Sequence, residues 1–210
     1  MGVWNGDRMK DALRNAVRVV ALLNLAYFGV EFSVALLIGS VSLFADSIDF
    51  LEDASINALI LLALAWSAPS RAEPSRAVPC RAVVSKVLAG IILIPGLATV
   101  WMAWQKFGAP MPPAPLPLSL TAAGALLVNS VCALILARVR HHGGSLGLAA
   151  FLSARNDVLA NAAIILAGLV TGYTLSVWPD LLVGLGIAIL NAGAAAEVYR
   201  ATGKESDATI

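Results

Sequence analysis

The sequence predicts an all-α membrane protein with six transmembrane helices and with both ends of the chain in the cytoplasm. Hydrophobic residues make up 59% of the 210 residues, and charged residues make up only 13%. A soluble domain carries about 25% charged residues, so this composition indicates an integral membrane protein. The hydrophobic residues also fall into runs of about 20, the length that a helix needs to cross the hydrocarbon core of a bilayer.

Six apolar segments are the expected helices, and they are separated by a GSVS turn, by proline-containing connectors or by short loops. Their bounds are about 17–38, 42–66, 83–104, 118–137, 146–171 and 180–199. The first segment follows basic residues, as the apolar part of a signal peptide does. It is too long for a signal peptide, however, and no A-x-A cleavage site ends it, so we expect a retained helix. We expect one transmembrane domain over residues 1–210 and no soluble domain.

Basic residues are concentrated in alternate loops, and this pattern predicts the orientation. They precede the first segment, lie between the second and third and between the fourth and fifth, and follow the sixth: Arg8, Lys10, Arg14, Arg18, Arg71, Arg76, Arg81, Lys86, Arg138, Arg140, Arg200 and Lys204. The other loops contain only Lys106. The positive-inside rule therefore places both termini in the cytoplasm of a multi-pass protein, which we expect in the inner (plasma) membrane.

Acidic residues interrupt the second segment in the stretch FADSIDFLEDA, although each should cost several kcal/mol to bury. At 100° per residue, one face of this helix carries Asp46, Asp49, Asp53 and Asn57. The fifth segment repeats the pattern with Ser153, Asp157 and Asn161, and Asn156 flanks them. On the first segment Asn24 and Glu31 are seven residues apart and share a face.

The depths of these acids coincide. Asp53 lies roughly 16 Å from the outer end of its helix, and Asp157 lies roughly 16 Å from the cytoplasmic end of the antiparallel fifth helix. Carboxylates at one level repel each other unless a cation or protons neutralise them. Ionisable residues inside a membrane usually mark an ion pathway or a binding site. A lone asparagine or serine, in contrast, often serves only to pack one helix against another. Glu31 and Asp46 can also face water in a vestibule.

The stretches that carry the acids resemble the cation diffusion facilitator family of divalent metal cation/proton antiporters. The match extends over nearly the whole chain, through GSVSLFADSIDFLEDA, LAAFLSARNDVLANAAIILAGLV, NLAYFGVEFSVALLIGS and VNSVCALIL. The resemblance implies a homodimer and a metal site of two residues four apart on the second helix and two four apart on the fifth. Those ligands would be Asp49, Asp53, Ser153 and Asp157. Accessory candidates are Asp46, Asn156, Asn161, Glu31 and Asn24.

Three features depart from the family pattern. Ser153 stands where the family has histidine or aspartate, and the histidine-rich loop is reduced to His141-His142. The family's C-terminal cytoplasmic domain is not expected in this short form. Histidine and cysteine ligands favour zinc, whereas an all-oxygen site suits harder ions such as manganese. The transported ion is therefore left open among zinc, manganese, cobalt, iron and cadmium, and we expect no cofactor besides it.

Other functions remain as alternatives to metal efflux. A proton-coupled exporter of a small organic cation would need aromatic walls, and few aromatic residues lie near the acids: Tyr27, Phe28, Phe44 and Phe50. An intramembrane aspartyl hydrolase would use two facing aspartates, but the chain lacks a Gly-x-Gly-Asp motif. A transport-inactive membrane scaffold is the third alternative. The chain has no basic patch with interleaved aromatic residues, so nucleic acid is not an expected partner. The sequence thus favours a transporter over an enzyme.

Overall fold

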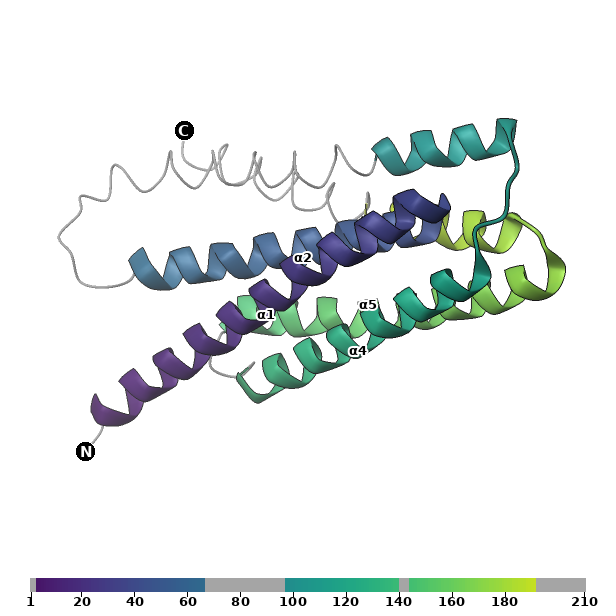
Figure 1. Ribbon diagram of the computed structural model, residues 1–210. Helices are drawn as coiled ribbons and strands as arrows, with labels where there is room; N and C mark the ends of the chain where they lie inside the picture. The colour runs from purple at the N-terminus through teal and green to yellow at the C-terminus, as the bar shows by residue number, and fades with distance from the viewer. Residues whose placement is uncertain (1–2, 67–96, 140–143, 192–210) are drawn as a thin grey trace, which may run out of the picture.

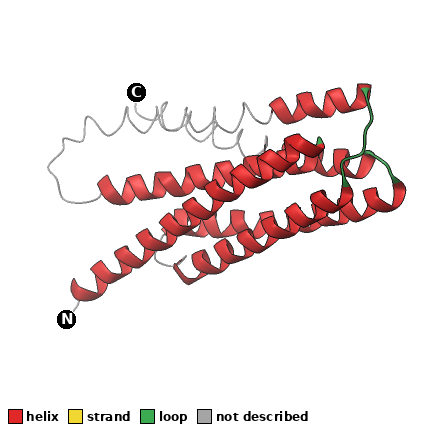
Figure 2. Cartoon of the chain, in the orientation of Figure 1, coloured by secondary structure: helices red, strands yellow, loops and turns green. Residues whose placement is uncertain are grey.

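The computed structural model describes residues 3–66, 97–139 and 144–191, with side chains at 11–62, 97–139 and 154–191. These residues form six helical segments and contain no strand (Figure 2). The helices are α1 (Val3–Ile38), α2 (Val41–Trp66), a segment at 97–108, α4 (Pro115–Val139), α5 (Gly144–Thr174) and a helix at Trp178–Asn191. The predicted all-α class is confirmed.

Three of the described helices are long and apolar enough to cross a membrane: Asp11–Ile38, Pro115–Val139 and Ala154–Thr174. Helix α2 has the length as well, but it contains four acidic residues. Helix α1 begins at Val3, before the apolar run that starts at residue 17, and its polar first part carries an exposed Asp11–Arg14 ion pair at 2.8 Å. Residues 83–96 and 192–199, where the sequence predicts parts of two further helices, lie outside the described residues.

The helices pack as a bundle in which α1 lies against α2 and α4, and α5 lies against α4 and α2. The α1–α2 turn, the connector 109–114 and the loop 175–177 all lie at the end of the bundle opposite the start of α1 (Figure 1). We call this the outer end, following the predicted orientation. Gly39 ends α1 with a φ of 64°, a left-handed conformation that glycine adopts without steric cost.

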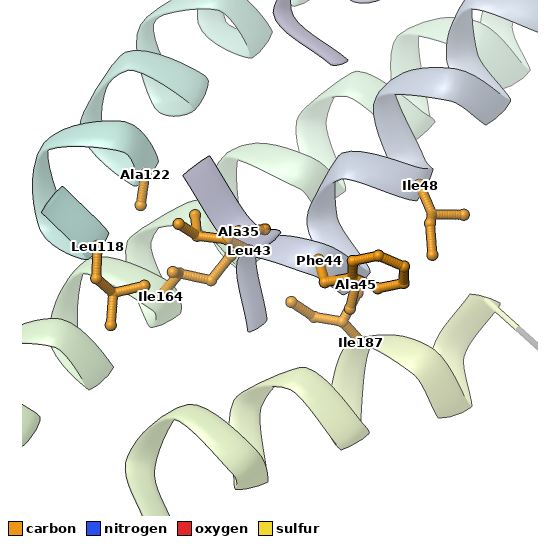
Figure 3. Close-up of a cluster of buried hydrophobic side chains, with 9 residues drawn as sticks. All are labelled: Ala35, Leu43, Phe44, Ala45, Ile48, Leu118, Ala122, Ile164 and Ile187. Atoms are coloured by element: carbon orange, nitrogen blue, oxygen red, sulfur yellow. The ribbon is translucent and has the colours of Figure 1, made fainter. Parts of the chain in front are cut away.

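Two large clusters of buried apolar side chains lie along the bundle, and a smaller third cluster at its outer end consists of Val41, Ala103, Val177 and Leu181. The outer cluster comes from five helices and consists of Ala35, Leu43, Phe44, Ala45, Ile48, Leu118, Ala122, Ile164 and Ile187 (Figure 3). The inner cluster consists of Leu13, Val17, Val20, Ile60, Cys132, Leu136 and Ala154. On each of α1, α2, α4 and α5, the residues between the two clusters include buried polar ones. A polar layer therefore lies between two apolar layers, at mid-length of the bundle.

Candidate functional site

The polar layer is built from side chains that are almost completely removed from solvent. Seven of them are at most 4% exposed: Asn24, Glu31, Asp46, Asp53, Asn57, Asn129 and Asn161. Asp49 and Asp157 are partly buried beside them. Because each of α1, α2, α4 and α5 contributes at least one residue, the layer depends on the tertiary packing and not on one amphipathic helix.

Asn24 links three helices within this layer. Its Nδ2 lies 3.4 Å from the Oδ2 of Asp53 on α2, to which it donates. Its Oδ1 accepts a weak hydrogen bond from the Cys132 thiol on α4, with a sulfur–oxygen distance of 3.5 Å. Asn57 donates to the backbone carbonyl of Asp53 at 2.7 Å, one turn away on α2. Asp53 is thus part of a hydrogen-bond network that holds the acidic face of α2 against α1.

The structure brings Asp157 of α5 close to the acidic face of α2. Asp157 lies near enough to Asp49 and Asp53 for the three carboxylates to act on one another electrostatically. Like charges at such separations disfavour full ionisation of the group. Among the described residues, however, no three His, Cys, Asp or Glu side chains converge closely enough to bind one metal ion together. The acids share a region, but in this conformation they do not form a closed coordination shell.

Glu31 and Asp46 form a second pair of carboxylates, nearer the outer end of the layer. Both are 0% exposed, and none of their four oxygens has a hydrogen-bond partner of normal geometry among the described residues. The two side chains lie close to each other, and Asn161 of α5 lies close to Asp46. Asn161 donates to the backbone carbonyl of Asp157 at 2.8 Å, and its own Oδ1 has no partner there either. Two carboxyl groups and an amide from three helices therefore meet at this point.

Not every residue that the sequence singles out lies in this layer. Asn156 is exposed on the surface of α5, so its position argues against the accessory role predicted for it. Ser153 belongs to α5, but its side chain lies outside the described part of the structure, as do His141 and His142. Glu52, the remaining acid in the stretch FADSIDFLEDA, is only partly buried.

Asn191 was missed by the sequence analysis. It ends the described part of the last helix, and its amide nitrogen donates a hydrogen bond to the Asp49 carboxylate on α2. The sequence contains one signal for this contact: Asn191 is the single polar side chain in the run GLGIAILNAGAAA. In a membrane helix an isolated amide commonly bonds across to a neighbouring helix.

A bundle of apolar helices with carboxylates buried at mid-length is typical of membrane proteins that bind or conduct cations. The chain matches the cation efflux transmembrane domain family over residues 17–205, and it belongs to this family of membrane cation transporters. The resemblance to cation diffusion facilitators is thereby confirmed. A comparison with curated proteins found no match. At the level of the family, the function is transport of divalent metal cations across a lipid bilayer, not enzymatic catalysis.

Proposed function

We propose that this protein exports a divalent metal ion across the inner (plasma) membrane in exchange for protons, with Asp49, Asp53 and Asp157 as the ion-binding residues. The observation that carries the proposal is the approach of Asp157 on α5 to Asp49 and Asp53 on α2 inside the bundle. Ser153 would supply a fourth oxygen one turn before Asp157.

The charges of these residues account for both halves of the exchange. Among the described residues, no lysine or arginine forms an ion pair with Asp49 or Asp157. Carboxylates kept this close inside a membrane favour a positive charge between them, because burial and mutual repulsion both make full ionisation costly. A divalent ion compensates two of them while bound, and protons compensate them after it leaves. Metal and protons therefore compete for the same oxygens.

Binding of the ion requires a small rearrangement of the layer. In the present structure Asp49 accepts from Asn191 and Asp53 accepts from Asn24. The hydrogen bond from Asn191 involves one oxygen of Asp49, so the other oxygen can turn toward Asp157. Hard divalent ions need oxygens at about 2.0–2.6 Å, so the carboxylates of α2 and α5 must turn toward one point, or the two helices must shift, for the ion to be enclosed. Rocking of α2 against α5 would both close the site and change the side from which it is reached.

The choice of ion follows from the ligands. Family resemblance favours zinc, cobalt or cadmium, whereas three carboxylates and a hydroxyl favour manganese or iron, because imidazole and thiolate are missing from the proposed set. A homodimer, as the resemblance implies, would be the transporting unit. No cofactor is needed for exchange of this kind.

Metal uptake by proteoliposomes under an imposed pH gradient tests the proposal. The panel is zinc, manganese, cobalt, iron and magnesium, and the control variant is Asp157→Asn. We expect uptake of one or a few metals that depends on the gradient and is lost in the variant. Failure of every metal to move, together with unchanged behaviour of the variant, would reject the metal site and favour an organic cation or a scaffold.

A further inference from the structure

A buried carboxylate at the outer end joins the last helix to the beginning of α2. Asp180 is 0% exposed and accepts four hydrogen bonds from the α1–α2 turn and the first residues of α2. The donors are Ser40 Oγ at 2.7 Å, Val41 N at 3.0 Å, Ser42 N at 3.1 Å and Ser42 Oγ at 2.6 Å. Asp180 therefore caps α2 from another helix, where the backbone N–H groups have no partner within α2 itself.

Lys106 completes this contact with a positive charge. Its ammonium group lies 2.9 Å from Asp180 Oδ2 and also donates to the Gly39 carbonyl at the end of α1. Lys106 is only 8% exposed, so the ion pair is shielded from water. These contacts thus join three separate parts of the chain: the helix at 97–108, the α1–α2 turn and the helix at Trp178–Asn191. We call this set of residues the outer anchor: Gly39, Ser40, Val41, Ser42, Lys106 and Asp180.

Next to the outer anchor, on its inner side, the last helix packs directly on the backbone of α2. A Cβ added to Gly184 would lie 2.7 Å from both Ser42 N and Val41 C, which is closer than real Cβ contacts allow. One turn further, Ile187 belongs to the same apolar cluster as Phe44 and Ala45, and its side chain points toward them (Figure 3). The two helices run in parallel from the outer end, and Gly184 lies against the backbone of Val41 and Ser42 and the Val41 side chain.

Asn191 lies on this same face of the last helix. At 100° per residue, positions 180, 184, 187 and 191 fall within about 60° of one another. Their partners advance along α2 in the same order, from Val41 and Ser42 at the outer anchor to Asp49 at Asn191. The hydrogen bond from Asn191 to Asp49 is therefore the inner end of one continuous helix–helix contact.

We propose that Asn191 is a positioning residue of the transport site, and that the last helix, held by the outer anchor, sets the place and orientation of the Asp49 carboxylate. This inference rests on the proposed function. By donating to one Asp49 oxygen, the amide orients the other oxygen and keeps the side chain from turning freely. Partners that orient a ligand in this way typically change metal affinity by about 10–100-fold when removed. They also affect the selection among ions, because ions differ in the ligand geometry that they require.

The test is a kinetic comparison in proteoliposomes, with the metal that wild type transports and one competing metal from the same panel. Asn191→Ala should raise the KM for the metal about tenfold with a smaller change in the maximal rate. It should also change the ratio of kcat/KM between the two metals. Asn191→Gln keeps an amide donor and should recover part of the loss. Asn15→Ala, on the exposed surface of α1, is the matched control and should behave like wild type.

A second pair of variants separates positioning from misfolding. Gly184→Ala should push the last helix away from α2 and raise the KM in the same direction as Asn191→Ala. Gly186→Ala should not, because nothing lies within 4 Å of the added Cβ. Thermal unfolding in detergent shows whether each variant is folded.

Unchanged KM and unchanged metal preference in Asn191→Ala, with Asp157→Asn inactive, would overturn the positioning role while leaving the proposed function intact. Normal transport by Asp157→Asn would instead reject the proposed function. A KM that rises equally for both metals, with no recovery in Asn191→Gln, would also overturn the inference, since it would indicate a general structural defect.

Discussion

Asp180 and Asp46 are both carboxylates with 0% exposure, yet their surroundings are opposite. Asp180 receives four hydrogen bonds from the start of α2 and its neighbours, and an ion pair with Lys106. Asp46 faces another carboxylate, Glu31, and has no partner of normal geometry in the described part of the chain. A buried charge whose requirements are met by the protein supports the fold. A buried charge whose requirements are not met needs a mobile positive charge, either a proton or a metal ion.

The largest expected effect is on metal transport, and it should distinguish an acid that binds the ion from an acid that stabilises the fold. Asp157→Asn should reduce metal transport to below about 1% of wild type, because loss of a ligand should exceed the ~10–100-fold effect of losing a partner that only orients one. The same change removes a source of repulsion in the layer, so the protein should remain folded. Initial rates of metal uptake and unfolding in denaturing detergent measure the two properties. Loss of folding in this variant would mean that Asp157 has a structural role like that of Asp180.

Breaking the outer anchor should have the largest effect on stability. Lys106→Met leaves Asp180 buried without its counter-charge, and removal of one partner from a buried ion pair typically costs about 3–5 kcal/mol. The free energy of unfolding in detergent should fall by about that amount. The double variant Lys106→Met/Asp180→Asn should be less destabilised than the sum of the two single changes, since no isolated charge remains. Strict additivity would show that the ion pair is not coupled.

Disrupting the contact between the last helix and α2 should have an intermediate effect on stability. Gly184→Ala forces a methyl group against the α2 backbone, and overpacking of this kind typically costs about 1–3 kcal/mol. Gly186→Ala should be neutral or slightly stabilising, because alanine favours helix and the position is open. Thermal unfolding of both variants in the same detergent compares them. Equal destabilisation would mean that the close approach at Gly184 does not limit the packing.

Neutralising the unpaired carboxylates should have the smallest effect on stability. Glu31→Gln replaces one of two adjacent buried acids with a neutral amide that can donate to Asp46. We therefore expect a gain of about 1 kcal/mol or no change, in contrast to the large loss expected at Lys106. The free energy of unfolding in detergent tests this difference. A loss of several kcal/mol on Glu31→Gln would place Glu31 with Asp180 among the structural acids.

The sequence was sufficient for the fold class, and it also predicts which acids share a helix face. Composition and runs of apolar residues predict membrane helices, because both reflect the local requirement that backbone and side chains be compatible with hydrocarbon. The spacing of Asp49 and Asp53 likewise shows that they share a helix face. The roles of Asn191 and Asp180 could not be predicted in this way. Each depends on which face of the last helix packs on α2, and the close approach at Gly184 decides that face.

The two-residue turn between α1 and α2 has a geometric consequence for any movement of these helices. Ile38 ends α1 and Val41 begins α2, so their Cα atoms are at most about 11 Å apart even if the chain between them is fully extended. The two helices can pivot about this point, but they cannot part there. Displacement between them must grow with distance from the turn and be greatest at their far ends, some 25 residues of α2 away. The turn thus acts as a hinge, and a small change in the angle between α1 and α2 produces a large displacement at the opposite end of the bundle.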